Sequence, residues 1–407
     1  MRRKKLLTTL LLALTLAAVE STHAQTFSTL YNFCSQHKCV DGHYSAGNLV
    51  LDKNGNLYGT TELGGSSGYG TVFELTAAGS YKAIYSFSGE PDGAYPTTLM
   101  FDANGNFFGT TLSGGVYQYG GTVFELTSAG IEKVLYSFTG GADGFYPEGP
   151  LVSDAQGNLY GTTYAGGPYY CFEGYGCGTV FEVSPDGTET TLYAFTGGAD
   201  DGESYSGVIR DASGNLYGTT AQAEDVGPQP GTVFKLTAAG VETPLYSFTG
   251  GKDGSGPLAG LVMDAKGNLW GTTYYGGKQS CYDGVEFGCG VVFKLTKRGK
   301  ETARYKFRGG NDGGYPASAL VEDGQGNLYG TTYYGGSLTC NSGVPSGCGV
   351  VFKIPKKGKQ VVLHSFTGGS DGAYPDAGLT LDAQRNLYGT TLSGGANGSG
   401  VVFKITP

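Results

Sequence analysis

The phrase Gly-Asn-Leu-Tyr-Gly-Thr-Thr occurs seven times along the chain with small changes, and it constrains the fold more than any other feature. The Asn residues of the seven copies are Asn56, Asn106, Asn158, Asn215, Asn268, Asn327 and Asn386, so the repeat is 50 to 59 residues long. A repeat of this length is too long for a leucine-rich repeat or a β-helix rung, and it fits a unit of four strands with long loops.

Each repeat contains four short strand-like segments in the same order. A short apolar run ending in Asp, such as residues 260–264, comes before the repeated phrase. A Gly-(Thr/Val)-Val-Phe-(Glu/Lys) segment and a Leu-Tyr-Ser-Phe segment follow it. Runs of β-branched and aromatic residues bounded by Gly, Asp and Asn are typical of strands joined by hairpins.

The last repeat has only three of its four segments, and the fourth is found at the other end of the chain, at residues 29–33. In a closed ring the first strand can complete the last sheet and pair two open strand edges. We therefore predict a single all-β domain, a seven-bladed β-propeller over residues 25–407. Residues 26–33 are expected to form the outermost strand of the blade built from residues 376–407. An open solenoid, which needs polar caps, is the alternative.

The composition agrees with a strand-rich fold. Gly and Pro together account for 89 of 407 residues, which excludes a mostly helical protein. The chain is 39% hydrophobic and only 15% charged, so it has enough apolar material to fold rather than remain disordered.

The N-terminus has the pattern of a secretory signal. Residues 2–5 are all basic, residues 6–19 are almost wholly apolar, and a small residue, Ala24, provides a cleavage site. We predict a signal peptide at residues 1–24 and therefore a secreted, periplasmic or cell-envelope protein. An uncleaved membrane anchor is less favoured, because the apolar run is shorter than the ~20 residues that span a bilayer.

The remaining chain is acidic. Without residues 1–24 it contains 22 Lys and Arg against 34 Asp and Glu, a net charge of −12. This balance argues against nucleic acid and anionic membranes as partners and leaves cations, neutral glycans or a basic protein. We expect no membrane insertion after signal cleavage and a monomer.

The repeated Asp and Gly residues have structural interpretations. Asp52 begins an Asp-x-x-Gly-Asn turn that recurs in every repeat, where its carboxylate can cap turn amides. Calcium ligation is the alternative, but one carboxylate per turn is far from the 6 to 8 oxygens that calcium takes. Gly59 and its equivalents are expected to let an aromatic ring of the neighbouring blade approach the backbone.

The variation in loop length falls on one face of the predicted disc, in the connections from the second to the third strand and from one blade to the next. The eight cysteines lie in these loops as close pairs, which predict four local disulfides in an exported protein. A metal site is the weaker alternative, since no Cys-x-x-Cys spacing or His partner accompanies them. The predicted pairs are Cys34 with Cys39, Cys171 with Cys177, Cys281 with Cys289, and Cys340 with Cys348.

Tyrosines gather in the same loops and are the candidate ligand-binding residues. Rigid aromatic faces held by disulfides can stack on sugar rings or anchor a protein. The alternative is that the first Tyr of each pair packs between blades. The candidates are Tyr164, Tyr274, Tyr275, Tyr333 and Tyr334.

Catalytic signals are sparse. No histidine pair for a metal, nucleophile elbow or phosphate loop is present. Glu148 and Asp376 follow Pro147 and Pro375 at the start of inner strands and do not recur in the repeat, so a carboxylate pair for glycoside chemistry is conceivable. We expect no cofactor and no metal.

The repeat unit resembles the GloVer tandem-repeat family of exported bacterial proteins, which use various C-terminal anchors. The resemblance rests on the phrase GNLYGTT, followed by Gly-Gly, GTVFELT and LYSFTGG, and it extends over residues 26–407. It implies an exported bacterial β-propeller, and it brings no established activity. The phrase around Asp52 also looks like that of NHL-type and streptogramin-lyase-type propellers.

Three functions remain open at this level. The first is a binding propeller that presents its Tyr-rich, disulfide-stapled loop face to a glycan or protein. The second is an extracellular carbohydrate-active or lyase-type enzyme, and the third is a cell-envelope scaffold.

Overall fold

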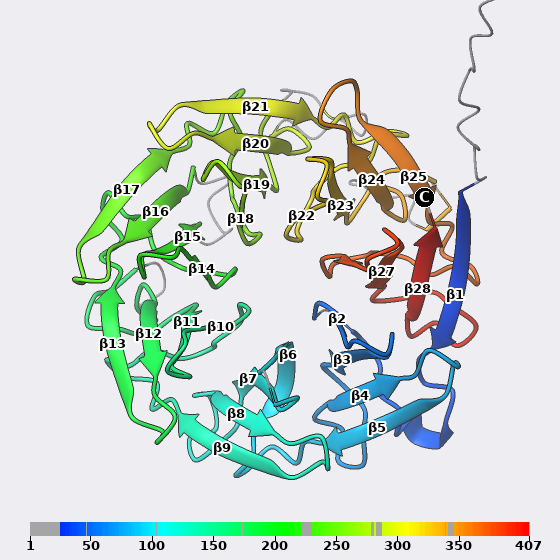
Figure 1. Cartoon of the computed structure of the whole chain (residues 1–407), viewed down its shortest axis with the longest axis horizontal. Coiled ribbons are helices and arrows are strands. Elements are labelled where there is room, and N and C mark those ends of the chain that lie inside the picture. Colours follow the sequence, from blue (N-terminus) through cyan, green and yellow to red (C-terminus); the bar gives the residue numbers. More distant parts are fainter. Residues whose placement is uncertain are drawn as a thin grey trace, which may run out of the picture.

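Seven four-stranded antiparallel sheets form the blades of a closed ring in the computed structural model (Figure 1). The predicted seven-bladed propeller is therefore confirmed. The structure describes residues 25–45, 47–102, 104–171, 175–221, 230–277, 281, 287–337, 339–340 and 346–406. The predicted signal peptide at residues 1–24 lies outside the described residues.

The strands of each blade run from the axis outward and are called A, B, C and D. Blade 1 comprises β2 (Val50–Leu51), β3 (Leu57–Thr61), β4 (Thr71–Leu75) and β5 (Tyr81–Ser86). Blade 2 comprises β6 (Ala94–Phe101), β7 (Phe107–Ser113), β8 (Thr122–Leu126) and β9 (Glu132–Ser137). Blade 3 comprises β10 (Val152–Ser153), β11 (Leu159–Thr163), β12 (Thr179–Val183) and β13 (Glu189–Ala194). Blade 4 comprises β14 (Val208–Arg210), β15 (Leu216–Thr220), β16 (Thr232–Leu236) and β17 (Glu242–Ser247).

The other half of the ring repeats this arrangement. Blade 5 comprises β18 (Val262–Met263), β19 (Leu269–Thr273), β20 (Val291–Leu295) and β21 (Glu301–Lys306). Blade 6 comprises β22 (Val321–Glu322), β23 (Leu328–Thr332), β24 (Val350–Ile354) and β25 (Val361–Ser365). Blade 7 comprises β26 (Thr380–Leu381), β27 (Leu387–Thr390), β28 (Val401–Thr406) and, from the start of the chain, β1 (Thr26–Asn32). A short 3₁₀ helix, η1 (His37–Cys39), follows β1.

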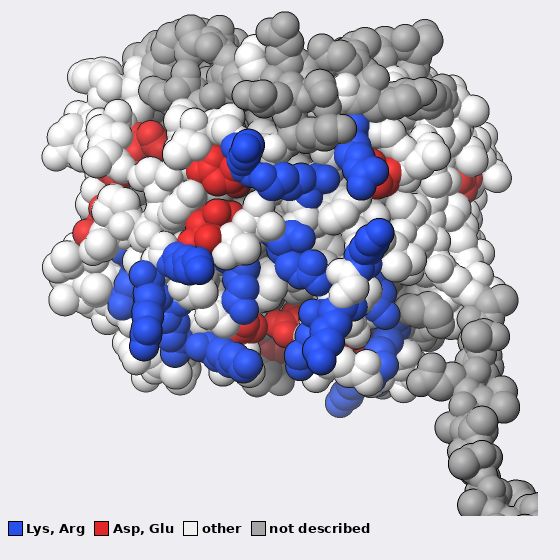
Figure 2. All heavy atoms as spheres, turned by 90° about the horizontal axis from the view of Figure 1, so that it is seen from above, with Lys and Arg blue, Asp and Glu red and all other residues white. Residues whose placement is uncertain are grey.

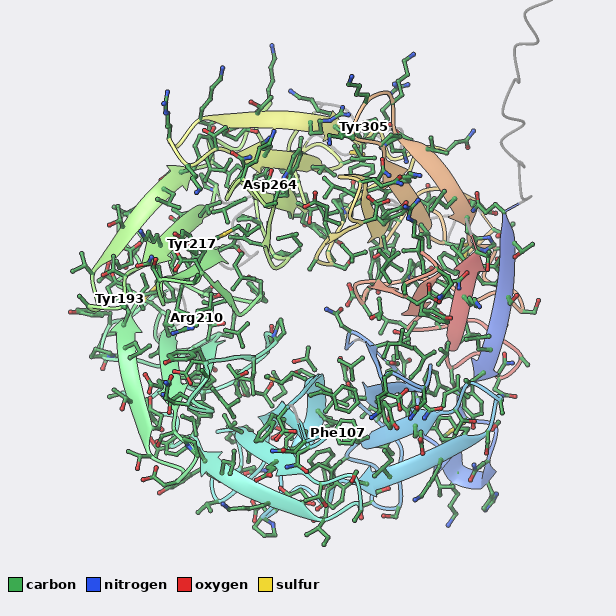
Figure 3. All side chains as sticks on the ribbon, in the orientation of Figure 1. Phe107, Tyr193, Arg210, Tyr217, Asp264 and Tyr305 are labelled. Atoms are coloured by element: carbon green, nitrogen blue, oxygen red, sulfur yellow. A yellow bond between two sulfur atoms is a disulfide. The ribbon has the colours of Figure 1, made fainter. Side chains whose placement is uncertain are left out.

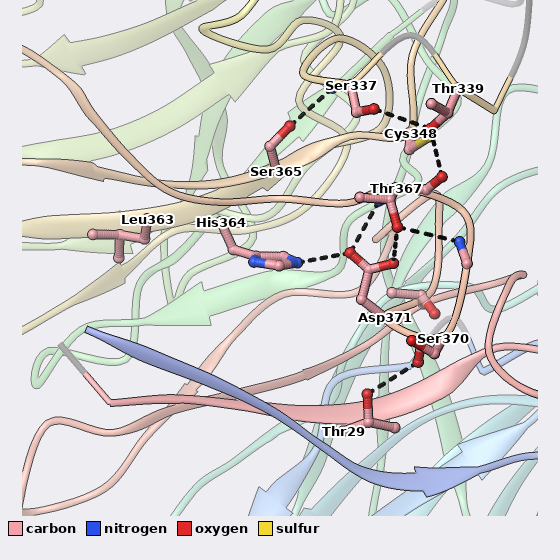
Figure 4. A network of polar contacts seen from close by, with 12 residues as sticks. Thr29, Ser337, Thr339, Cys348, Leu363, His364, Ser365, Thr367, Ser370 and Asp371 are labelled. Carbon is pink, nitrogen blue, oxygen red and sulfur yellow. Dashed lines mark hydrogen bonds and ion pairs between the residues drawn. The ribbon is translucent and has the colours of Figure 1, made fainter. Parts of the chain in front are cut away.

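The ring closes by the pairing of β1 with β28, which Figure 1 shows side by side at the right of the ring. Phe27 of β1 packs against Phe403 of its own blade, with ring centroids 5.7 Å apart, and stacks on His364 of blade 6 at 3.9 Å. The Thr29 hydroxyl donates a hydrogen bond to the Ser370 carbonyl oxygen at 3.1 Å (Figure 4). The closing strand is therefore held by its own blade and by the neighbouring one.

The glycine in each B strand has a structural role that differs from the predicted one. Gly59 lies directly opposite Phe73 of β4 in the same blade, and a Cβ at Gly59 would lie 2.7 Å from the end of that ring. The prediction that the ring comes from the neighbouring blade is wrong. Phe73 instead folds across the backbone of its own partner strand, a contact that only glycine allows.

Neighbouring blades are joined by a repeated polar contact, here called the inter-blade clasp. The Tyr85 hydroxyl at the end of blade 1 donates a hydrogen bond to Asp92 at 2.6 Å, and Glu132 of blade 2 lies beside both groups. Tyr193 and Tyr305, labelled near the outer strands in Figure 3, make the same bond to Asp200 and Asp312.

The clasp of blade 6 has a histidine in place of the tyrosine. His364 Nε2 lies 3.0 Å from Asp371 Oδ2, and Thr367 donates to Asp371 through both its backbone N–H and its hydroxyl (Figure 4). A residue near the start of the next D strand completes the site by stacking, as Phe27 does here. In blade 1, Tyr81 stacks on Tyr31 in the equivalent way, at 4.0 Å.

The Asp-x-x-Gly-Asn turns use their carboxylates internally. Asp52 Oδ1 accepts backbone N–H bonds from Asn54 and Asn56, each at 2.8 Å, and Oδ2 accepts the Asn56 side-chain amide at 3.0 Å. Burial would raise the pKa of Asp52, but these bonds outweigh it and hold the pKa below its ordinary value. Arg385 replaces the turn glycine in the last copy and adopts a φ of 67°. These contacts support the turn interpretation over calcium ligation.

Candidate functional site

The long loops of the ring share one face. Isolated β-bridges join the B–C loop to the connection that precedes its own blade in blades 1, 3, 5, 6 and 7, for example His43 with Leu63 and Phe145 with Ala165. All four predicted disulfides are formed on these loops, and the described residues contain no free cysteine. Three of them close the B–C loops of blades 3, 5 and 6. We call this side of the disc the loop face.

A cavity of about 310 Å³ is lined by residues of all seven blades, which places it on the axis of the ring. Most of its wall comes from the segments that lead from the loop face into the inner strands. Blades 1, 3 and 7 contribute carboxylates to it. The lining residues with polar or aromatic side chains are Asn48, Glu62, Thr97, Thr98, Glu148, Tyr205, Ser206, Ser318 and Asp376.

The structure brings the two unrepeated acids, Glu148 and Asp376, into this one cavity and adds a third, Glu62. Burial, followed by the charges of Glu62 and Asp376, raises the pKa of Glu148 to about 7. Burial and the charge of Asp376 raise the pKa of Glu62 to about 7, and burial raises that of Asp376 to about 6. Near neutral pH the cavity therefore contains both protonated and ionised carboxyl groups, which supply hydrogen-bond donors as well as acceptors.

Glu62 was missed by the sequence reasoning. It follows the repeated Thr-Thr pair, a position occupied elsewhere by Leu112, Tyr164, Ala221, Tyr274, Tyr333 and Leu392. Listing this position across the seven copies would have revealed it as the one acid.

Tyrosines flank the cavity on two sides. At the blade 3 to blade 4 side, Tyr164 packs on Tyr205, with ring centroids 4.8 Å apart. At the blade 6 to blade 7 side, Tyr333 stacks on Tyr374 at 5.2 Å, and burial together with the charge of Asp376 raises the pKa of Tyr333. Of the candidate tyrosines, Tyr164 thus packs on a residue of the cavity wall, and the charge of Asp376 acts on the pKa of both Tyr333 and Tyr334.

The other candidate tyrosines belong to a half-buried aromatic cluster between blades 5, 6 and 7. Tyr274 and Tyr275 both pack against Tyr315, at 5.2 Å and 6.1 Å, and Tyr334 packs against Tyr315 at 5.7 Å. Their rings therefore contribute to packing between blades as well as to the loop face.

Sequence reasoning also missed the strained tyrosines of the loop face. Tyr95, Tyr146, Tyr315 and Tyr374 each precede a proline and have φ between 57° and 61°, a region that bulky residues rarely adopt. Two backbone hydrogen bonds hold Tyr315 in this conformation. Its N–H donates to the Cys289 carbonyl oxygen, and its own carbonyl oxygen accepts from the Tyr333 N–H. The repeated Tyr-Pro dipeptide, next to the Asp of the clasp, is the signal that could have found them. Backbone strain of this kind gathers at functional sites.

The blade 3 to blade 4 side of the cavity differs from the others in its hydrogen bonding. Thr219 and Thr331 pair with Ser206 and Ser318 of their own blades at 2.8 Å and 2.6 Å. In contrast, the buried hydroxyls of Thr162 and Ser204 have no hydrogen-bond partner among the described residues. Polar groups left in this state are candidates for contact with a ligand or water.

In the described part of the chain, no group of three or more His, Cys, Asp or Glu residues could hold a metal ion. The same residues include no helix with the length and apolar character needed to cross a membrane.

The family model of the Gloeobacter/Verrucomicrobia repeat matches residues 17–175 and 171–343. The chain belongs to this family. The resemblance of its sequence repeats to GloVer proteins is thereby confirmed. A search of curated proteins found no match for this Gloeobacter/Verrucomicrobia repeat protein.

Solved structures resemble the repeat protein in fold alone. The extracellular domain of BT4673 from B. thetaiotaomicron matches 93% of this chain with a TM-score of 0.53 and 10% identity. PorZ, a surface component of the type-IX secretion system of Porphyromonas gingivalis, matches 90% with a TM-score of 0.50 and 13% identity. This chain spans only 39% of the first structure and 46% of the second. XC5397, a gluconolactonase from Xanthomonas campestris, matches 78% of this chain and 87% of its own length, with a TM-score of 0.45 and 14% identity. The four disulfides are of a kind that forms and persists in oxidising compartments outside the cytosol.

Proposed function

We propose that this propeller is an exported binding protein that takes a neutral glycan at the mouth of its axial cavity. The observation that carries the proposal is the convergence of Glu62, Glu148 and Asp376 in one cavity, flanked by Tyr164 and Tyr333. Sugar rings present hydroxyls that pair with carboxyl groups, and apolar C–H faces that pack on aromatic rings.

The electrostatics favour an uncharged ligand over an anion. Among the described residues that line the cavity, three are acids and none is Lys, Arg or His. An anionic ligand would meet like charge there, whereas a neutral polyol can accept and donate hydrogen bonds with carboxyl groups whose pKa values lie near 6 and 7. The cavity volume of about 310 Å³ is at the lower end of the range of ligand sites, so only one end of a glycan needs to enter.

The side that carries Tyr164 and Tyr205 is the best candidate for the sugar-stacking surface. Thr162 and Ser204 are buried there without hydrogen-bond partners among the described residues. We expect the tyrosine pair to support the ring of the sugar while Glu148 bonds its hydroxyls.

A glycan array with the mature protein tests the proposal. A Tyr164→Ala, Tyr205→Ala variant should lose binding by about tenfold or more, since stacking and pocket shape are lost together. Tyr170→Ala is the matched control, because Tyr170 is 83% exposed on a loop of the same blade. A double variant that binds as the wild type does, or an array without any hit, would refute the proposal.

An enzyme is the second candidate, and the placement of Glu148 and Asp376 in one cavity favours it. With pKa values of about 7 and about 6, Glu148 can act as a general acid and Asp376 as a general base near neutral pH. Release of reducing or unsaturated ends from a bound glycan would support this function. Glu148→Gln and Asp376→Asn should then each abolish turnover while binding persists.

A further inference from the structure

The charge of the molecule is distributed very unevenly around the ring. Residues 50–194, which form blades 1 to 3, contain 3 Lys and Arg against 15 Asp and Glu. Residues 262–365, which form blades 5 and 6, contain 13 Lys and Arg against 7 Asp and Glu. The net charge of −12 therefore conceals a basic region with the opposite sign.

The basic residues replace neutral ones at a fixed position of the repeat. The turns from strand C to strand D read Thr-Ala-Ala-Gly in blades 1 and 4. The same turn reads Thr-Lys-Arg-Gly-Lys in blade 5 and Pro-Lys-Lys-Gly-Lys in blade 6. All six of these side chains are exposed, and we call them the basic turns: Lys297, Arg298, Lys300, Lys356, Lys357 and Lys359.

Packing between blades joins the two turns into one surface. Arg304 of β21 donates hydrogen bonds to the carbonyl oxygens of Pro355 and Gly358 in the turn of blade 6, at 2.9 Å and 3.2 Å. The guanidinium of blade 5 thus lies against the turn of blade 6. Figure 2 views this side of the disc, the one at the top of Figure 1, and shows Lys and Arg gathered over it, with Asp and Glu side chains among them.

Ion pairs leave most of this charge available. The salt bridges among the described residues include Lys294 with Asp264 and Arg308 with Asp312, but none involves a residue of the basic turns. Glu322 is an acid near Lys356, and the charge of that lysine acts on its pKa against the effect of burial. The basic turns therefore present a positive field to solvent.

We propose that the basic turns of blades 5 and 6 form a binding surface for an acidic, carboxylate-bearing polysaccharide. The surface is made mainly of lysine, a flexible point charge suited to carboxylates spaced along a chain. It lies at the rim of the face opposite the loop face, so an extended polymer can contact both turns. The large exposed hydrophobic residues of the described chain include none from the basic turns, which gives a membrane no apolar anchor there.

The acidic remainder of the ring favours a polymer of low charge density over nucleic acid. Duplex DNA carries one charge per ≈ 1.7 Å, and segments that extend beyond the basic turns would meet the acidic blades. A polysaccharide with one carboxylate per sugar suffers less from this repulsion, which fades over about 8 Å at physiological salt.

The test is the affinity for polygalacturonate oligomers, measured by biolayer interferometry on the mature wild-type protein. The variant gives both basic turns the residues found in the turn of blade 1: Lys297→Ala, Arg298→Ala, Lys300→Ser, Lys356→Ala, Lys357→Ala and Lys359→Ser. Because blade 1 folds with that turn sequence, the variant should fold, and its melting temperature checks this. Each lost exposed pair weakens binding by about 1.5- to 5-fold, so the whole variant should bind at least about tenfold more weakly.

A control variant removes exposed lysines from the acidic half of the ring: Lys53→Ala, Lys82→Ala and Lys133→Ala. Its affinity should stay within about twofold of the wild type, and wild-type binding should weaken as salt rises. Equal loss in both variants, unchanged binding by the turn variant, or no binding of polygalacturonate would overturn the proposal. Stronger binding of duplex DNA or of phosphatidylglycerol vesicles than of polygalacturonate would also overturn it.

Discussion

The glutamates of the inter-blade clasps should make the stability of the ring depend on pH. Glu132, Glu242 and Glu301 begin the D strands of their blades, and each has one buried carboxyl oxygen without a hydrogen-bond partner in the described structure. Burial, followed by the charge of the clasp Asp, raises the pKa of each to about 7 from an ordinary value of 4.5. The sixth copy has Gln360 at this position, so the fold accepts the neutral amide.

The direction of the effect follows from the raised pKa. A carboxyl group that binds its proton more tightly in the folded state stabilises the fold below pH 4.5, and that contribution is lost as the pH rises through about 7. A shift of this size corresponds to about 3 kcal/mol for a fully buried group. These carboxyls are only partly buried, and solvent screening reduces the figure to about 1 kcal/mol each. The three together should cost about 3 kcal/mol at pH 8.

Differential scanning calorimetry of a Glu132→Gln, Glu242→Gln, Glu301→Gln variant measures this cost. The unfolding entropy is about 2.1 cal/mol/K per residue, so 3 kcal/mol shifts the melting temperature of a ring of this size by about 4 °C. The variant should melt like the wild type at pH 4 and about 4 °C higher at pH 8. Glu90→Gln, at an exposed glutamate, is the control and should leave both profiles unchanged. Parallel pH profiles for the triple variant and the wild type would refute the reasoning.

Three further predictions concern stability. Gly59→Ala should destabilise the ring by about 1–3 kcal/mol, because its Cβ would meet the Phe73 ring at 2.7 Å, and a normal urea midpoint would contradict this. Loss of the Cys171–Cys177 disulfide by serine substitution should cost about 2 kcal/mol in the entropic model of loop closure, and an unchanged melting curve would show that the link adds nothing. The free energy of unfolding of His364→Tyr should stay within about 0.5 kcal/mol of the wild type, because Tyr31 makes the same stacking contact and hydrogen bond in blade 7. His364→Leu should destabilise the ring, because it leaves Asp371 without its His364 partner.

The features that could be predicted from the sequence are those that recur at the same position of each repeat. Seven copies of one phrase with the fourth strand missing from the last copy were enough for the blade number and the closure by β1. The cysteine pairs were predicted because each lies within a single loop. The sequence analysis assigned the ring that contacts Gly59 to the wrong blade, although the pairing of adjacent strands in one blade already places Phe73 opposite the glycine.

The candidate site was only partly predictable because it depends on what seven distant segments bring to the axis. Glu148 and Asp376 were recognised since they follow prolines at the start of inner strands, whereas Glu62 comes after a B strand and resembles an ordinary loop residue. The basic turns were hidden for a different reason. Net charge averages over the whole ring, and the sign of the charge changes between blade 3 and blade 5.

Closure by β1 also has a consequence for the order of folding. Contacts between consecutive blades join residues about one repeat apart, whereas closure joins Thr29 to Ser370, 341 residues away. The entropy of closing that longer loop costs about 2 kcal/mol more than closing a single repeat. Closure should therefore come last, after six blades have assembled in sequence. A circularly permuted chain that opens in another connection between blades would transfer this last step to that junction, because the ring has no preferred starting point once it is closed.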